Sequence, residues 1–194
     1  MKKMTRVLAF LAISLLALQV DAQKVKTISG NDDVLKPESS INIEFVYDGL
    51  SVGNYSNEAD YVKAKTEEYN KKEPGKGDTW AASWAKDKAA RFEPKFIELF
   101  KINSGMSVVN DAKYTLIFKT ISIEPGFNIA IKRKNAEIDG EVWIVETANR
   151  SNKVAVFTIS NVPGGTPFGY DFDTGLRISE AYANAGKKLA KSLK

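Results

Sequence analysis

The sequence of 194 residues contains no histidine and no cysteine. The chain therefore cannot form Ser-His-Asp or Cys-His catalytic pairs, and it lacks the side chains that hold most zinc ions. Disulfide bonds are excluded as well, so packing alone must stabilise the fold. An enzyme built from this chain would have to use carboxylates, lysine, tyrosine or serine, as two-carboxylate glycosidases do. We therefore expect no cofactor and no bound metal ion, and catalysis is the less favoured interpretation.

Long apolar runs are scarce, and the one present lies at the start of the chain. Lys2, Lys3 and Arg6 precede the apolar run Val7–Leu18, and Val20-Asp21-Ala22 then supplies small residues at a cleavage site. This order predicts a secretory signal peptide over residues 1–22, with an uncleaved anchor as the alternative. The exported chain would begin at Gln23. We expect it in the periplasm, outside the cell or on the cell surface.

The exported chain also lacks a large charge excess. Removing the three bases and one acid of residues 1–22 from totals of 28 and 24 leaves 25 basic and 23 acidic residues. This near balance argues against a nucleic-acid partner. No second apolar stretch is long enough to span a membrane. The length suits a single domain over residues 23–194, in which the polar residues 23–40 are expected to form an extended or loose arm.

Hydrophobic periodicity in the first half predicts one strand followed by helices. Residues 41–47 alternate apolar and polar side chains, as a half-buried strand does. Asn57 is a suitable cap for a helix that ends near Lys71. A second helix starts at about residue 78, and Pro94 predicts a break or kink near Phe92 before the helical pattern resumes as far as residue 103.

The second half predicts a run of strands and a closing helix. Residues 114–123 and 154–159 read as strands, and residues 174–193 as an amphipathic helix. Residues 127–134 and 137–147 are expected to pair as a hairpin around Asn135-Ala136, with Asp139-Gly140 as an alternative turn. That register sets Lys134 against Glu137 and Lys132 against Asp139. The predicted class is α+β, a two-layer sandwich with a largely antiparallel sheet of 4–5 strands and helices on one face.

Six residues are candidates for ligand binding. Trp80 and Trp84 lie one helical turn apart and could present an aromatic platform to a glycan or peptide, although aromatic residues at this spacing usually belong to the core. The others lie in the loops 48–56 and 161–170, where glycine permits close approach to a ligand. They are Gly53, Tyr55, Gly164 and Gly165.

Two groups of carboxylates have a structural explanation that we favour over a functional one. Glu137, Asp139 and Glu141 share one face of a predicted strand, where charge pairing across the hairpin is favoured over a catalytic pair or a calcium site. Asp171 and Asp173 have the Asp-x-Asp spacing of calcium loops, but the glycine and glutamate that such a loop requires are missing. Helix capping accounts for these two acids.

Parts of the chain resemble known exported proteins. The stretch from Tyr61 through Trp80, Trp84, Arg91, Phe92 and Phe96, and the ending Ile178-x3-Tyr182-x3-Gly186-Lys187-Lys188-Leu189-Ala190, resemble uncharacterised exported proteins common in Bacteroidetes. The order of elements is also similar, in layout only, to small periplasmic domains such as the amino-terminal domain of TolB. The resemblance implies an envelope protein and carries over no activity and no site residue.

The sequence thus favours a non-catalytic envelope module that binds or scaffolds an envelope component, either a protein or a glycan. A carboxylate-dependent enzyme acting on glycans and a self-assembling structural subunit are the alternatives. An enzyme would require a pocket with two unpaired carboxylates about 5–9 Å apart. A subunit that assembles with copies of itself would require an exposed strand edge.

Overall fold

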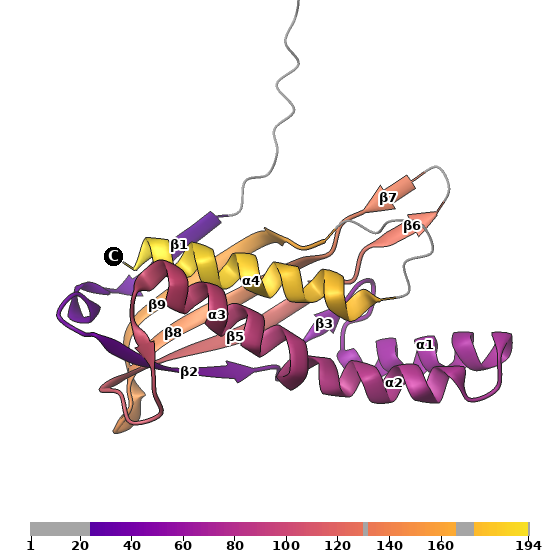
Figure 1. Ribbon diagram of the computed structural model, residues 1–194, viewed down its shortest axis with the longest axis horizontal. Helices are drawn as coiled ribbons and strands as arrows, with labels where there is room; N and C mark the ends of the chain where they lie inside the picture. Colours follow the sequence, from indigo (N-terminus) through magenta and orange to yellow (C-terminus); the bar gives the residue numbers. More distant parts are fainter. Residues whose placement is uncertain (1–23, 130–131, 166–172, 194) are drawn as a thin grey trace, which may run out of the picture.

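The computed structural model describes residues 24–129, 132–165 and 173–193, and the predicted signal peptide lies outside these ranges (Figure 1). The described part of the chain begins with a strand and ends with a long helix. In chain order its elements are β1 (Lys24–Gly30), a 3-10 turn (Asp33–Leu35), β2 (Ser40–Val46), β3 (Ser51–Val52), α1 (Glu58–Lys72), α2 (Lys76–Asp87), a π-helical turn (Lys88–Phe92), α3 (Glu93–Ser104), β4 (Ser107–Val108), β5 (Tyr114–Glu124), β6 (Phe127–Ile129), β7 (Lys132–Lys134), β8 (Glu137–Glu146), β9 (Asn149–Pro163) and α4 (Thr174–Ser192).

Seven of the described strands form one mixed sheet in the order β1-β9-β8-β5-β2-β4, with β3 also paired to β5. The pairs β1–β9, β9–β8 and β8–β5 are antiparallel, whereas β2 and β3 run parallel to β5 and β4 runs parallel to β2. The expected α+β class is confirmed, but the largely antiparallel sheet of 4–5 strands is wrong. The physical reason is the helical connection through α1–α3 that follows β2. It brings the chain back to the sheet as β5, parallel to β2.

The segment expected to be a loose arm is part of the sheet. Residues Lys24–Gly30 form the edge strand β1, which pairs with β9 over Ala155–Ser160. Leu35, in the short helical turn that follows, is only 3% exposed. The strand was missed because most of its side chains are exposed, so no apolar alternation marks it.

The predicted hairpin between residues 127–134 and 137–147 does not form. β6 pairs with β7, and β8 lies between β5 and β9. Lys134 therefore binds Glu124, with 2.7 Å between Nζ and Oε2, and does not face Glu137. Asp139 accepts hydrogen bonds from the Ser122 hydroxyl at 2.7 Å and from the Asn161 amide at 2.8 Å. β8 has buried apolar side chains on one face, and it is more stable with a long partner strand on each side than it would be in an isolated hairpin.

The helical predictions are largely confirmed. Asn57 caps α1, its side chain accepting a hydrogen bond from the Asp60 amide at 2.9 Å. The break expected near Phe92 is a π-helical turn directly before α3. The predicted apolar stripe of α4 is buried along its whole length, and its members are Ile178, Tyr182, Ala185, Leu189 and Leu193.

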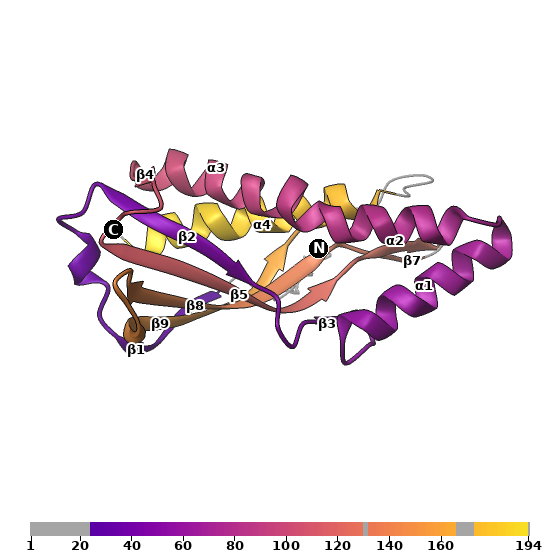
Figure 2. The same cartoon turned by 90° about the horizontal axis from the view of Figure 1, so that it is seen from below.

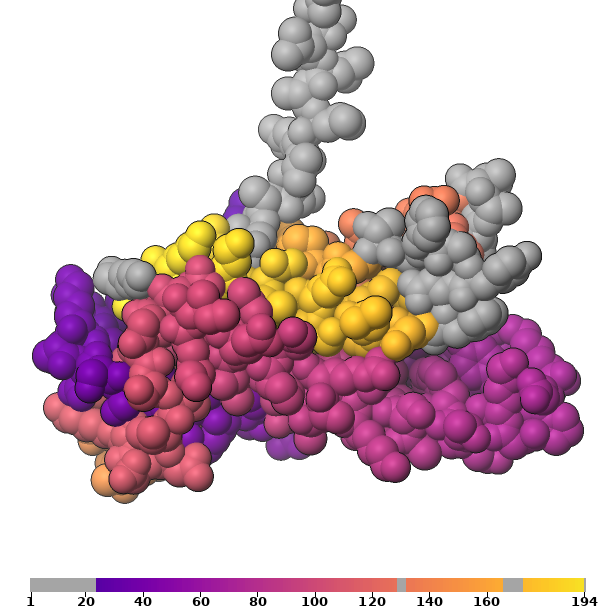
Figure 3. Space-filling view, viewed as in Figure 1, coloured from indigo at the N-terminus to yellow at the C-terminus, as the bar shows by residue number. Residues whose placement is uncertain are grey.

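The helices lie on one side of the sheet, and the α1–α2 pair extends beyond its end (Figure 2). Helices α3 and α4 lie side by side and form a continuous surface in the space-filling view (Figure 3). Between the layers, the ring of Phe96 lies 5.0 Å from that of Phe118, and the ring of Tyr182 lies 5.8 Å from Phe118. Among the described helices, none is both long enough and apolar enough to cross a membrane.

Close contact between α3 and α4 depends on Gly186. A Cβ atom at this position would lie 2.2 Å from the carbonyl oxygen of Phe96 on α3. We predict that Gly186→Ala lowers the free energy of unfolding by about 1–2 kcal/mol. A contact of 2.2 Å with a backbone atom places the clash at the upper end of overpacking costs, about 2–3 kcal/mol, and the gain of about 1 kcal/mol in helix propensity offsets part of it.

Urea denaturation measures this change, with Lys187→Ala as the control. Lys187 is the next residue on α4 and is exposed, so its replacement should change the free energy of unfolding by less than about 0.5 kcal/mol. A Gly186→Ala protein as stable as the wild type would show that the two helices can separate without loss of packing.

Candidate functional site

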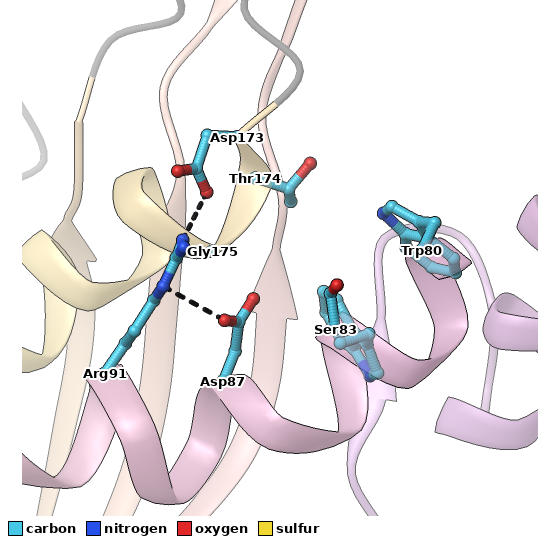
Figure 4. Close-up of a pocket in the computed structure, with 8 residues that line it drawn as sticks. Trp80, Ser83, Asp87, Arg91, Asp173, Thr174 and Gly175 are labelled. Carbon is cyan, nitrogen blue, oxygen red and sulfur yellow. Dashed lines mark hydrogen bonds and ion pairs between the residues drawn. The ribbon is translucent and has the colours of Figure 1, made fainter. Parts of the chain in front are cut away.

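A hollow of about 330 Å³ lies where α2 and the π-helical turn meet the start of α4 (Figure 4). We call it the Trp80 pocket. Most of its lining comes from one face of α2 and the π-helical turn that continues it, and the rest comes from the start of α4. The lining residues are Trp80, Ser83, Trp84, Asp87, Arg91, Asp173, Thr174 and Gly175. Its volume falls at the small end of the range typical of ligand sites, about 300–1,000 Å³.

The two tryptophans of the pocket have different environments. Trp84 is 3% exposed, and its Nε1 donates to Glu58 at 2.7 Å, so it belongs to the core. Trp80 stacks on Trp84 at 5.7 Å between ring centroids and is half-buried, with part of its ring exposed. Its indole nitrogen lies on the side of the ring that faces Thr174 (Figure 4). Among the described residues, the Trp80 N–H has no hydrogen-bond partner and is available to a ligand.

Arg91 joins two carboxylates in the wall of the pocket. Its Nε lies 3.2 Å from Asp87 Oδ1 and its Nη1 lies 2.5 Å from Asp173 Oδ1. Asp173 also caps α4, accepting a hydrogen bond from the Leu176 amide at 2.9 Å. The Asp87 side chain is only 13% exposed. Burial raises the pKa of this carboxyl, the charge of Asp173 raises it further, and Arg91 opposes both effects.

Gly175 allows α4 to approach this charged group. A Cβ atom there would lie 2.1 Å from Asp87 Oδ2 and 3.1 Å from Arg91 Nη1. Any side chain at this position would displace the Asp87 carboxylate from the start of the helix. The positive end of the helix dipole therefore lies beside a carboxylate, which is a favourable arrangement.

A second hollow, of about 540 Å³, lies between α1, the start of α4 and the segment from β5 to β7. We call it the lysine groove. Its lining is mostly aromatic, charged and glycine residues. The complete lining is Gly53, Asn54, Tyr55, Tyr61, Lys65, Glu68, Tyr69, Lys72, Glu124, Pro125, Gly126, Phe127, Asn128, Lys134, Thr174 and Arg177. Thr174 lines both hollows.

The six candidate residues fall into three places. Trp80 and Trp84 line the Trp80 pocket, and Gly53 and Tyr55 line the lysine groove. Gly164 and Gly165 line neither hollow. Their amides donate to Ala136 O at 2.7 Å and to Arg177 O at 2.9 Å, so they connect the end of β9 to β8 and α4. Their role in the described structure is packing of the backbone.

The sequence analysis missed the three charged residues of the pocket wall as a group. Asp87 and Arg91 have the i, i+4 spacing of a helical ion pair, which was a usable signal. Asp173 was interpreted as a helix cap, and this prediction is confirmed. Nothing in the local sequence indicates that Arg91 reaches Asp173, 82 positions away.

The expected absence of a metal site can be examined only within the ranges that the structure describes. There, no group of three or more carboxylate side chains is arranged to hold an ion. Glu141 accepts a hydrogen bond from Trp143 Nε1, and Asp139 is bound to Ser122 and Asn161. The lysine partner predicted for Asp139 is wrong, and both acids form hydrogen bonds within the described structure instead. Asp171 lies outside the described residues.

Comparison with known proteins identifies no family. No protein-family model matches the chain, and no curated protein sequence matches it. Among solved structures, a PelC dodecamer from Paraburkholderia phytofirmans is 11% identical, with 84% of this chain and 96% of that chain covered and a TM-score of 0.36. A variant of the same dodecamer gives 10% identity, 86% and 99% coverage and a TM-score of 0.35. These similarities are too low to bear on the fold or the function of this chain.

The raised pKa of Asp87 predicts how stability varies with pH. The folded protein binds this proton more tightly than the unfolded chain, whose carboxyl has the ordinary pKa of 3.8. The stability that this group contributes is therefore present below pH 3.8 and is lost as the pH rises through the folded-state pKa. Asp87→Asn does not titrate. We predict that the free energy of unfolding of the wild type, minus that of Asp87→Asn, falls as the pH rises from below 3.8 through the folded-state pKa.

Chemical denaturation of both proteins at several pH values tests this prediction. A difference that rises with pH would mean that attraction to Arg91 outweighs burial, and that the pKa of the carboxyl is lowered on folding. The comparison cancels the titration of groups that both proteins share.

Proposed function

We propose that this protein is a non-catalytic module of the cell envelope that binds a glycan through the Trp80 pocket. The observation that carries the proposal is the half-buried indole of Trp80, which borders a hollow lined by the charged group Asp87–Arg91–Asp173. The envelope location comes from the signal peptide predicted over residues 1–22.

A glycan suits the mixture of surfaces in the pocket. Sugar rings present C–H groups on one face and hydroxyl groups at their rim. An aromatic side chain with one polar edge can pack against the first and hydrogen-bond to the second, as the indole of Trp80 can. Carboxylate oxygens of Asp87 and Asp173 accept hydrogen bonds from hydroxyls, and the guanidinium of Arg91 donates them. A hydrophobic ligand would displace water from these charged groups without replacing its hydrogen bonds, at a cost in free energy.

Binding is favoured over glycan cleavage by the pairing of the carboxylates. A two-carboxylate glycosidase needs one protonated acid and one ionised base or nucleophile aimed at the bond to be cleaved. In the Trp80 pocket, Asp87 and Asp173 both contact Arg91, and Asp173 also caps α4. These contacts give both carboxylates structural partners. The enzyme alternative would require a ligand that separates them from Arg91.

Replacing Trp80 tests the proposal. We predict that Trp80→Ala abolishes the rise in melting temperature that a bound glycan causes, because the variant loses the aromatic surface of the site. A thermal-shift screen of the wild type against cell-wall fragments and neutral oligosaccharides first identifies the ligand. Trp80→Phe should keep part of the shift, since it retains an aromatic face.

Trp143→Ala is the matched control. Trp143 is a half-buried tryptophan on β8 that lines neither hollow, and Lys153 Nζ lies 3.6 Å from its ring centroid. This variant should keep the full ligand-induced shift even if its own melting temperature is lower. Equal shifts in the wild type and Trp80→Ala would reject the Trp80 pocket as the site, and the absence of any shift would reject glycan binding.

A further inference from the structure

The lysine groove has features of a binding site. Only Gly53 and Tyr55 of its lining were candidates from the sequence, and the proposed function does not involve it. It is larger than the Trp80 pocket, at about 540 Å³ against about 330 Å³. It lies between α1, the turn from β5 into β6 and the start of α4. Three elements distant in sequence therefore contribute to it, and its shape depends on the complete fold.

Positive charge exceeds negative charge in the described lining of the groove. The lining contains four basic side chains, Lys65, Lys72, Lys134 and Arg177, and two acidic ones, Glu68 and Glu124, of which Glu124 is paired with Lys134. Bases and acids occur in nearly equal numbers in the chain as a whole, so this excess is local. A hollow with an excess of one charge concentrates ligands of the opposite charge.

On α1, one carboxylate forms ion pairs with two lysines. Glu68 Oε2 lies 2.8 Å from Lys65 Nζ, and Glu68 Oε1 lies 2.7 Å from Lys72 Nζ. Hydrogen bonds from both lysines lower the pKa of the Glu68 carboxyl, so it stays ionised and holds both ammonium groups in place. One positive charge of this group remains uncompensated and is available to an anion.

Aromatic rings line the same groove. Tyr69 has both lysine ammonium groups over its ring, at 5.7 Å for Lys65 and 5.4 Å for Lys72. Tyr55 is 37% exposed, and its ring lies 5.8 Å from that of Tyr61. The combination of rings and ammonium groups fits a ligand that has both a ring with C–H faces and a negative charge.

The groove adjoins the Trp80 pocket. Thr174 lines both hollows, and contacts between aromatic rings connect the two linings. Tyr61 contacts Tyr55 on the groove side, and its ring lies 5.7 Å from that of Trp80 on the pocket side. A single oligosaccharide could therefore contact both hollows at once.

We infer that the lysine groove is a second subsite, which binds a carboxylate-bearing sugar of the glycan held by the Trp80 pocket. The inference rests on the proposed function and adds the charge class of the ligand. The Trp80 pocket supplies stacking for either kind of sugar. The groove distinguishes an acidic saccharide from a neutral one of the same length.

Two tetrasaccharides that differ only in the lactyl ether groups that carry the carboxylates test this inference. One is chitotetraose, which is built of N-acetylglucosamine and is neutral. The other alternates N-acetylglucosamine with N-acetylmuramic acid, which carries a lactyl carboxylate on the same sugar ring. Isothermal titration calorimetry of the protein should show the acidic tetrasaccharide binding about three- to tenfold more tightly, with the preference falling as salt rises, because ions screen exposed charges.

Lys72→Gln and its neighbour Lys71→Gln form a matched pair of variants. Both residues are exposed lysines in the last turn of α1, but only Lys72 lines the groove. Lys72→Gln should reduce the affinity for the acidic tetrasaccharide about threefold and leave the affinity for chitotetraose unchanged. Lys71→Gln should change neither. Potassium lactate is included to separate a sugar-borne carboxylate from a free one.

The outcomes distinguish this inference from the proposed function. Equal affinities for the two tetrasaccharides, both lost in Trp80→Ala, would overturn the acidic subsite and leave glycan binding intact. Lactate binding as tightly as the acidic tetrasaccharide would overturn the role of the sugar. Binding of neither tetrasaccharide would overturn both proposals.

Discussion

Pro94 constrains the helical layer on which the rest of the structure depends. Proline has no amide hydrogen to complete an α-helical bond, and the chain accommodates it with a π-helical turn just before it. The Glu93 amide bonds the carbonyl of Lys88, five residues earlier, and the helix then continues as α3. From this turn Lys88 binds Glu58, the first residue of α1, and Phe92 enters the core to stack on Tyr182 at 5.0 Å. One turn thus attaches the projecting helices to the packed layer.

The Trp80 pocket is a consequence of the same turn. Trp80, Asp87 and Arg91 recur at helical spacing on one face of α2 and the turn, and that face lies against the start of α4. Arg91 spans the two helices through Asp87 and Asp173. The polar groups of the pocket are consequently held in position before a ligand arrives. Such preorganisation lowers the entropic cost of binding, since fewer side chains must be ordered by the ligand.

Local patterns predicted the elements but not their partners. The cap at Asn57, the break near Phe92 and the buried stripe of α4 are short-range features, and they were predicted from spacing and residue type. The partners of β8 depend on chain segments far away in sequence, and a hairpin was the simplest local alternative. The parallel pairing of β2 with β5 likewise follows from a helical crossover, whose path the strand sequences do not encode.

The candidate site residues likewise could be predicted only in part from the local sequence. Helical spacing brought Trp80 and Trp84 together as candidates, yet it could not say which ring is buried, because that depends on Glu58 and α1. Gly164 and Gly165 were chosen because glycine permits close approach, and the fold uses their missing side chains to bring the end of β9 close to α4. Glycine marks close approach equally well for a ligand and for another segment of the chain. Only the tertiary neighbours of a residue separate these two roles, so sequence candidates of this kind become informative once the fold shows which of them border the same hollow.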